Sequence, residues 1–329
     1  MNCESKKYRR IVVKIGSNVL TREDGRPDTT RISALVDQLA RLHRAGTEFI
    51  LVSSGAVASG RSLLETRVGR IDTVSARQLF SAVGQVKLLN RYYDLFNEYG
   101  IACGQVLTTK ESLSTRRQYL NQRNCMEAML AAGVVPIVNE NDTISVTELM
   151  FTDNDELSGL VAAMMGAEAL VILSNIDGIY DGSPSDPASQ VIRRVAPGRD
   201  LSQYIDTARS SRGRGGMTTK SRISSRAAGE GIEVVIANGR RDGILTDLVL
   251  TGENILTDLI LTDRDVVCTR FEAAPRPASG VKKWIASSEG FAKGALHLDA
   301  GAAAAVSQSK AASILAVGVT AVEGDFERD

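Results

Sequence analysis

The stretch IVVKIGS at residues 11–17 sets the architecture expected for the whole chain. Ile11 to Ile15 is a short run rich in β-branched residues, which is typical of a strand buried on both faces of a sheet, and Gly16 opens a turn behind it. Lys14 interrupts the run, and burying an ammonium group without a partner costs several kcal/mol. We therefore expect its head group to meet an anion at the strand end, beside a glycine that lets phosphate approach the backbone. The alternative is a lysine on an edge strand that reaches solvent.

Similar apolar runs recur along the chain, and helical patterns separate them. The further runs lie at 49–52, 102–107, 134–138, 169–173 and 233–237, and the helical patterns at 32–45, 74–99, 120–132, 156–165 and 218–229. Alternation of strands and helices is typical of an α/β fold. We predict a mainly parallel central sheet sandwiched by helices on both faces.

Small and polar residues follow four of the predicted strands. They are Gly16-Ser17-Asn18, Ser53-Ser54-Gly55-Ala56, Asn139-Glu140-Asn141-Asp142 and Ser174-Asn175-Ile176-Asp177-Gly178. In a parallel sheet, ligands collect beyond the carboxyl ends of the strands. The sequence therefore places a candidate ligand site at this edge.

A glycine-rich turn, GRGGMTTK at 213–220, runs directly into a helical pattern with Thr218 as its expected cap. Backbone N–H groups at a helix start bind phosphate oxygens well. The turn is not a Walker A loop, because no GK[ST] follows a GxxxxG frame, and it does not fit GxGxxG. The alternative is a loop that is merely flexible.

Two acidic clusters, at 139–142 and 153–156, flank a short connector. Alternating carboxylate and amide groups suit an ammonium ligand, a hydrated Mg²⁺ ion or fixed lysines. Asp153 could equally be a helix N-cap, with Glu156 completing a capping box.

Together these parts favour phosphoryl transfer to a carboxylate, a nucleophile that is ionised at neutral pH and needs no general base. Lysines, backbone N–H groups and Mg²⁺ suit the remaining task of neutralising the charge of the phosphoryl group. The chain has only two histidines, His43 and His297, in unpromising positions. A Ser-His-Asp hydrolase or a histidine-liganded metalloenzyme is therefore disfavoured.

The composition also limits the kinds of binding partner and the cellular compartment that we expect. Lys plus Arg and Asp plus Glu both number 39, so no global field favours nucleic acid or an anionic membrane. The four cysteines lack CxxC spacing, which argues for a reducing compartment. Since we find neither a signal-peptide core nor a stretch apolar enough to cross a bilayer, we expect a cytoplasmic protein.

The motifs resemble those of the amino-acid kinase superfamily across essentially the whole chain. Five blocks occur in the family's order, at 12–20, 52–57, 135–142, 153–158 and 215–220. The resemblance implies the amino-acid kinase fold for residues 1–270. The remainder, 271–329, is a proline-containing linker followed by a small β-rich segment similar to the start of a PUA domain.

The resemblance also implies a role for each matching residue. Lys14 and Lys220 would stabilise the phosphoryl group, with Asp155 holding the two ammonium groups in register. The glutamate contacts would be Ser54, Asp142 and Asn154, with Asn139 and Asp153 close by. The ATP contacts would be Lys14, Ser174, Asn175, Arg214, Gly215, Gly216, Met217, Thr218, Thr219 and Lys220. Asn175 stands where many members have aspartate, and Arg214 where many have threonine.

The activity implied in this way is transfer of the ATP γ-phosphate to the γ-carboxylate of L-glutamate, the step that opens proline biosynthesis. ATP and Mg²⁺ would be required, with Mg²⁺ bound mainly through the ATP phosphates and not by a protein metal site. Further implications are a homo-oligomer, feedback inhibition by L-proline and coupling to glutamyl-phosphate reductase. The alternatives are another kinase of the superfamily, acting on acetylglutamate or aspartate, and a non-catalytic regulatory or RNA-binding relative.

Overall fold

The computed structural model describes most of the chain as two compact units, Met1–Trp284 and Ile285–Asp329. The described residues are 5–6, 8–64, 69, 71–113, 115–145, 151, 153–204, 216–251, 266–275, 294–307 and 313–324. Within these ranges, we find no helix with both the length and the apolar character needed to cross a membrane.

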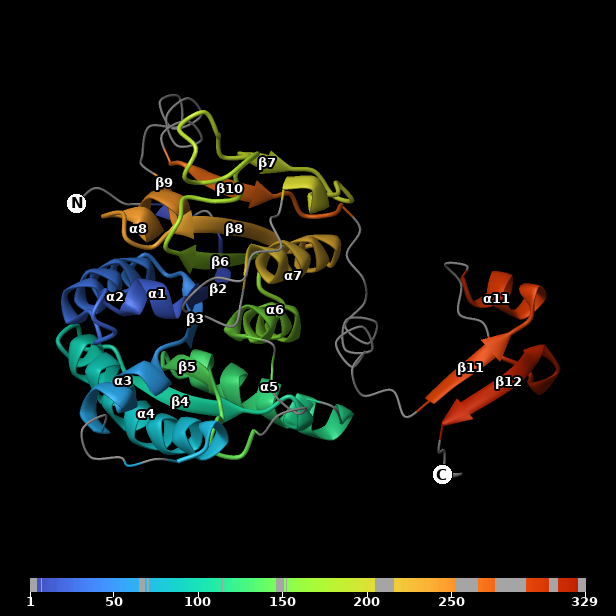
Figure 1. The fold of residues 1–329 in the computed structure, drawn as a ribbon, viewed down its shortest axis with the longest axis horizontal. Coiled ribbons are helices and arrows are strands. Elements are labelled where there is room, and N and C mark those ends of the chain that lie inside the picture. Colours follow the sequence, from blue (N-terminus) through green and yellow to red (C-terminus); the bar gives the residue numbers. More distant parts are fainter. Residues whose placement is uncertain are drawn as a thin grey trace. The chain divides into compact units, whose positions relative to one another are not determined.

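An eight-stranded sheet forms the centre of the first unit (Figure 1). Across the sheet the strands are β4 (Cys103–Thr108), β5 (Val135–Glu140), β3 (Glu48–Ser53), β2 (Arg10–Ile15), β6 (Ala169–Ser174), β8 (Glu233–Asn238), β10 (Cys268–Phe271) and β7 (Arg194–Val195). Neighbouring strands from β4 to β8 are parallel, whereas β10 is antiparallel to β8. The prediction of a mainly parallel sheet is confirmed, and the antiparallel edge is an addition to it.

Helices cover both faces of this sheet (Figure 1). They are α1 (Ser17–Leu20), α2 (Thr29–Arg44), α3 (Ala56–Leu64), α4 (Thr73–Asn97), α5 (Arg116–Ala131), α6 (Asn154–Met165), α7 (Met217–Gly229) and α8 (Ile244–Val249). Short 3-10 turns lie at Glu111–Leu113 and Ser202–Tyr204 of the same unit. One apolar cluster joins the sheet to α2, α4 and α8, and a second joins it to α5, α6 and α7. The sheet is therefore sandwiched, as predicted.

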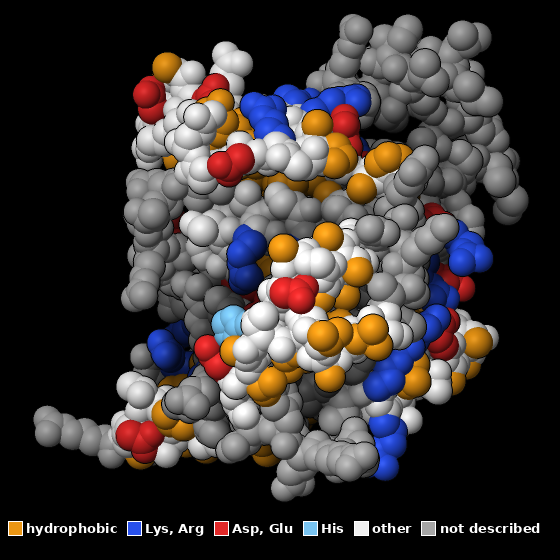
Figure 2. Space-filling model, turned by 90° about the vertical axis from the view of Figure 1, so that its right-hand side faces the viewer, with side chains coloured by type: hydrophobic (Ala, Val, Ile, Leu, Met, Phe, Trp, Pro, Cys, Tyr) orange, Lys and Arg blue, Asp and Glu red, His pale blue; other side chains and the backbone are white. Residues whose placement is uncertain are grey.

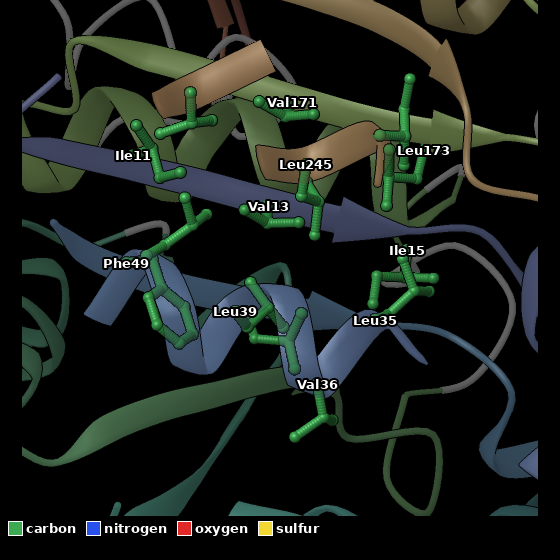
Figure 3. Packing of buried hydrophobic residues seen from close by; sticks show 14 of the residues in the cluster. Ile11, Val13, Ile15, Leu35, Val36, Leu39, Phe49, Val171, Leu173 and Leu245 are labelled. Atoms are coloured by element: carbon green, nitrogen blue, oxygen red, sulfur yellow. The ribbon is translucent and has the colours of Figure 1, made fainter. Parts of the chain in front are cut away.

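Strand β2 shows how the two faces are built. Ile11, Val13 and Ile15 pack against α2 and α8 (Figure 3), whereas Val12 belongs to the cluster on the α6 and α7 side. Because side chains alternate along a strand, Lys14 shares the face of Val12. Lys14 is 4% exposed on a strand with a neighbour at each edge, so the alternative of an edge-strand lysine is wrong.

The predicted strands and helices all form, within a few residues of the expected bounds. In the first unit, the patterns missed α1, α3, α8, β7, β10 and two strands of only two residues each. The helices α1 and α8 are only 4 and 6 residues long, which is too short for a helical pattern of apolar residues to be recognised. The sequence repeats ILTDLVLT at 244–251 as ILTDLILT at 255–262. Its first copy forms α8 and β9 (Leu250–Thr251), which pairs with β1 (Ser5–Lys6); the second lies outside the described residues.

The second unit contains a small antiparallel sheet of β11 (Gly294–Leu298) and β12 (Val319–Gly324), with α11 (Ala300–Val306) between them in sequence. The expected β-rich C-terminal segment is thus present. Leu315 and Val317 are 68% and 87% exposed. Figure 2 shows hydrophobic side chains among charged ones on one face of the molecule. Part of the PUA-like motif lies outside the described residues, so that resemblance stays a prediction.

Candidate active site

A buried carboxylate joins the two predicted catalytic lysines at the carboxyl ends of the strands. Lys14 Nζ lies 2.6 Å from Asp155 Oδ1, and Lys220 Nζ lies 2.9 Å from Asp155 Oδ2. Burial alone would raise the pKa of the Asp155 carboxyl, but the charges of the two lysines outweigh it and hold that pKa below its ordinary value. Asp155 is therefore ionised at neutral pH, and it keeps both ammonium groups at one place.

Asp153 is the N-cap of α6, as the alternative interpretation of the sequence stated. Its Oδ1 accepts hydrogen bonds from the N–H groups of Asp155 and Glu156, at 2.9 and 3.0 Å. Its Oδ2 is buried and has no hydrogen-bond partner among the described residues. Burial, together with the nearby charge of Asp155, raises the pKa of Asp153. Capping by Asp153 fixes where α6 begins, and hence where Asp155 stands.

The turn after β2 brings backbone close to the Lys14 ammonium group. The Gly16 N–H donates to the Leu173 carbonyl at 3.0 Å, which ties the turn to the end of β6. A Cβ atom added at Gly16 would lie 3.1 Å from that oxygen and 3.6 Å from Lys14 Nζ. Glycine therefore keeps the space beside the ammonium group open, as expected for a turn that phosphate approaches.

Helix α7 begins at Met217 with Gly216 as its N-cap, and no side chain caps it. The prediction that Thr218 caps this helix is wrong, because Thr218 already lies in the first turn. Met217, Thr218 and Thr219 share that turn with Lys220, so their N–H groups are among those that a helix start leaves for a ligand. Arg214 and Gly215 lie outside the described residues.

A hydrogen-bond network joins three of the predicted glutamate contacts. Asn154 Nδ2 lies 3.0 Å from Ser54 Oγ and 3.0 Å from Asn139 Oδ1, and 3.3 Å from the Ser53 carbonyl oxygen. Asn154 precedes Asp155 on α6, so this network directly adjoins the lysine pair. The structure thus brings Ser54, Asn139 and Asn154 together beside the group that would handle phosphate.

The other predicted glutamate contact, Asp142, is bound by side chains that the sequence interpretation did not include. Asp142 Oδ2 accepts a hydrogen bond from Ser81 Oγ at 3.1 Å, and Arg77 pairs with Asp142 Oδ1. Arg77 also lies 3.3 Å from Glu140. Burial and the charge of Asp142 raise the pKa of Glu140, whereas the Phe151 N–H and Arg77 lower it. The pKa is raised overall. The spacing of Arg77 and Ser81, two polar residues four apart in the helical pattern at 74–99, is the sequence feature that could have pointed to these contacts.

The predicted ATP contacts on β6 lie beside another unpredicted cluster. Ser174 is buried at the end of β6 and its carbonyl accepts the Gly239 N–H at 2.8 Å, whereas Asn175 is exposed. Asp177 Oδ1 accepts hydrogen bonds from Arg241 Nε at 2.7 Å and Asn238 Nδ2 at 3.0 Å. Burial would raise the pKa of Asp177, but these donors lower it overall. This cluster joins the ends of β6 and β8 at the expected nucleotide side.

The arrangement has two chemically different ends that meet at the start of α6. One end holds two ammonium groups on one carboxylate, which suits a phosphoryl group in transfer. The other presents amides, a hydroxyl and carboxylates, which suit an amino acid. In the part of the chain that the structure describes, no group of three His, Cys, Asp or Glu residues could hold a metal ion.

Sequence comparison finds relatives over nearly the full chain. A model of the amino acid kinase family matches residues 9–238. A protein named glutamate 5-kinase from Bacteroides thetaiotaomicron is 62% identical over 322 residues, which cover 98% of this chain and 86% of that relative. A protein of the same name from Chlorobaculum tepidum is 44% identical over 323 residues, covering 98% of this chain and 85% of that relative.

Solved structures show the same fold at low identity. A structure of isopentenyl phosphate kinase has a TM-score of 0.51 and 17% identity, covering 72% of this chain and 94% of its own. The product complex of isopentenyl phosphate kinase from T. acidophilum has a TM-score of 0.54 and 14% identity, covering 80% of this chain and 100% of its own. At such identities the likeness extends to the fold alone.

Proposed function

This chain belongs to the amino acid kinase family, and we propose that it acts as a glutamate 5-kinase. The reaction transfers the γ-phosphate of ATP to the γ-carboxylate of L-glutamate and yields glutamyl 5-phosphate and ADP. The observation that carries this proposal is the buried Asp155 carboxylate with an ammonium group on each oxygen, next to the Asn154 network. A charge-stabilising end and an acceptor-binding end within one helix turn are what this transfer needs.

The chemistry follows from the ionisation of the acceptor. A glutamate side chain has a pKa of about 4.3, so the γ-carboxylate is a ready nucleophile at neutral pH and no general base is required. One carboxylate oxygen forms a bond to the γ-phosphorus while the bond from that phosphorus to the β-phosphate bridging oxygen breaks. Lys14 and Lys220 stabilise the negative charge on the phosphoryl oxygens during this exchange.

Asp155 acts through the lysines and not on the substrate. Each of its oxygens faces an ammonium group, and despite its burial the lysine charges lower its pKa, so it is a weak base. Its charge also keeps two lysines close together in a buried place, where they would otherwise repel each other. The lysines are thereby preorganised, and no rearrangement has to precede phosphoryl transfer.

ATP would lie across the glycine turn after β2, the end of β6 and the start of α7. Gly16 leaves room beside Lys14, and the first turn of α7 supplies N–H groups to the phosphates. We expect Mg²⁺ to enter the site on the phosphates of the nucleotide. Bound there, Mg²⁺ would neutralise charge on the β- and γ-phosphate oxygens.

Recognition of glutamate would use the opposite end of the site. Asp142, with Asp153 nearby in sequence, supplies carboxylates for the α-ammonium group, and Ser54, Asn139 and Asn154 supply hydrogen-bonding groups. An acceptor with a free ammonium group fits these charges better than an acylated one. Aspartate and acetylglutamate are the rival acceptors within the family.

A hydroxylamine trap tests the assignment of the acceptor. Purified protein is incubated with ATP, Mg²⁺, hydroxylamine and one acceptor at a time. An acyl phosphate reacts with hydroxylamine to give a hydroxamate, which is then measured as its coloured complex with Fe³⁺. We expect product with L-glutamate, and much less with aspartate or acetylglutamate. If one of the other two reacts and glutamate does not, the substrate assignment is wrong.

The family resemblance also supports three broader proposals about partners. They are assembly into a homo-oligomer, inhibition by L-proline, and coupling to a glutamyl-phosphate reductase that consumes the unstable acyl phosphate. Addition of L-proline to the trap assay should lower the rate. A rate that does not respond to proline would remove feedback from the proposal.

A further inference from the structure

Helix α4 contacts the acceptor end of the site through three polar side chains. Arg77 pairs with Asp142 and Glu140, Ser81 donates to Asp142, and Gln85 Oε1 accepts from Asn139 Nδ2 at 2.8 Å. Residues four apart lie on the same face of a helix, so these three side chains form one polar stripe. The stripe contacts Asn139, Glu140 and Asp142 at the end of β5, and two of these, Asn139 and Asp142, are proposed glutamate contacts.

The stripe is enclosed within the protein. Ser81 and Gln85 are 3% and 8% exposed, and the Arg77 side chain is 19% exposed. Buried polar groups lower stability unless they are hydrogen-bonded, so the contacts of the stripe are specific requirements of this packing. An apolar face on α4 would remove these partners from Asn139, Glu140 and Asp142, which are themselves buried. The polar stripe therefore does something for the strand end that apolar packing would not do.

The position of α4 is itself tightly fixed. A Cβ atom added at Gly84 would lie 1.8 Å from the Ala56 carbonyl oxygen, and one added at Gly60 would lie 1.8 Å from the Phe80 carbonyl oxygen. The backbones of α3 and α4 are thus in direct contact at these two glycines. Because α3 starts at Ala56, directly after Ser54 and Gly55, this crossing joins α4 to the loop that carries a proposed glutamate contact.

We propose that α4 positions the acceptor end of the site and that Arg77 is its principal positioning residue. The proposal rests on the glutamate kinase function proposed above and adds residues to that site. Arg77 holds the Asp142 carboxylate in place and stands between it and Glu140, two negative groups that would otherwise repel each other. Two carboxylates and one guanidinium leave one negative charge, which matches the single ammonium group of glutamate.

An arginine suits this place better than a lysine would. The guanidinium group presents several N–H donors in a rigid plane, so it can bind two carboxylates at once in a defined geometry. A lysine supplies the same charge from a single flexible head group. Arg77→Lys should therefore restore part of what Arg77→Ala loses, and a full restoration would mean that charge alone matters.

The first test is the kinetics of Arg77→Ala with glutamate and ATP varied separately. We expect the KM for glutamate to rise about 10- to 100-fold, the range for losing a hydrogen bond to a charged group. The kcat and the KM for ATP should stay within about 3-fold, because the lysine pair is untouched. Lys87→Ala, which removes an exposed cation from the same helix, is the matched control and should change none of these constants.

Two results would overturn the positioning role. An unchanged KM for glutamate in Arg77→Ala would mean that Asp142 holds its place without Arg77. Equal losses in the constants for glutamate and ATP, with a lowered melting temperature, would mean that Arg77 supports the fold in general. If the wild-type protein itself gives no hydroxamate with glutamate, the proposed function has failed and not the inference about Arg77.

A double-mutant cycle makes the test independent of folding losses. Glu140→Gln removes the neighbouring negative charge while keeping an oxygen that can accept the Phe151 N–H. In the Arg77→Ala background, Glu140→Gln should recover at least about 3-fold of the lost glutamate KM, since the repulsion on Asp142 is relieved. If the two substitutions worsen the KM independently, Arg77 does not act between these carboxylates.

Discussion

The two ends of the site are held by different forces. At the phosphoryl end, Lys14 and Lys220 are held by charge on one carboxylate that is buried completely. At the acceptor end, Asn154 is held by hydrogen bonds to Ser54, Asn139 and a backbone carbonyl, each between neutral groups. The lysine pair thus has strong interactions with one partner, whereas the Asn154 network has weaker, directional interactions that are shared. The acceptor end also contains a charged part, in which Arg77 pairs with Asp142 and Glu140.

This difference predicts how each end responds to substitution. Removing one member of a buried ion pair leaves an uncompensated charge, which costs about 3 to 5 kcal/mol. Removing one member of a shared network of neutral groups costs about 1 kcal/mol, because the remaining partners can still bond to one another. We therefore expect larger losses from substitutions in the lysine pair than from substitutions in the Asn154 network.

The largest effect is expected for Asp155→Asn. The substitution keeps the shape of the side chain but removes the carboxylate charge that both buried ammonium groups contact. The free energy of unfolding should fall by about 3 to 5 kcal/mol and turnover should be lost. Denaturant unfolding measures the first and the trap assay the second. Asp94→Asn, at an exposed position on α4, is the control, and equal unfolding midpoints for the two variants would contradict the prediction.

The next effect is on turnover in Lys14→Ala and Lys220→Ala. Each variant loses a preorganised donor to the phosphoryl oxygens, so kcat should fall by at least about 10²-fold. The KM for glutamate should change little in comparison, since neither lysine belongs to the acceptor network. Activity within a few-fold of wild type in either variant would remove that lysine from the mechanism.

A smaller effect is expected at the acceptor end for Asn154→Ala. Here the KM for glutamate should rise about 10-fold, while the free energy of unfolding should change by only about 1 kcal/mol. The comparison with Asp155→Asn is direct, because the two residues are neighbours on α6. Asn90→Ala, at an exposed place on α4, serves as the control. A loss of stability as large as that of Asp155→Asn would mean that the lysine pair and the Asn154 network do not differ in this way.

The smallest effect is a pH dependence limited to the acceptor end. The pKa of Glu140 is raised, so this group takes up a proton at a higher pH than an ordinary glutamate, whereas the pKa of Asp155 is lowered. As the pH falls below neutral, Glu140 gains a proton before an ordinary glutamate would, so the acceptor end loses negative charge while Asp155 stays ionised. The KM for glutamate should then rise a few-fold at constant KM for ATP. A Glu140→Gln enzyme with the same pH profile as wild type would exclude Glu140 as the cause.

Local patterns predicted much of the fold because strands and helices of ordinary length have a clear periodicity. The runs at 11–15 and 169–173 and the helical pattern at 218–229 are examples, each within a few residues of the observed element. The predicted N-cap of α7, Thr218, lies two positions after the observed N-cap, Gly216, because threonine is the commoner capping residue. Helix α3 was not predicted because its sequence, AVASGRSLL, consists mostly of small residues and lacks a stripe of large apolar ones. The small residues let α3 pack directly against the backbone of α4.

The sequence by itself determined that Lys14 would lie inside an apolar strand beside a glycine, and that polar groups would gather where parallel strands end. Only the tertiary structure decided which of these groups meet. The contacts of Lys14 and Lys220 with Asp155 depend on β2 lying next to β6 and on α6 packing against α7. The contact of Arg77 with Asp142 depends on two glycines that let α3 and α4 touch. Periodicity assigns a side chain to a face of its own element, whereas strand order and helix crossings set the distances between elements.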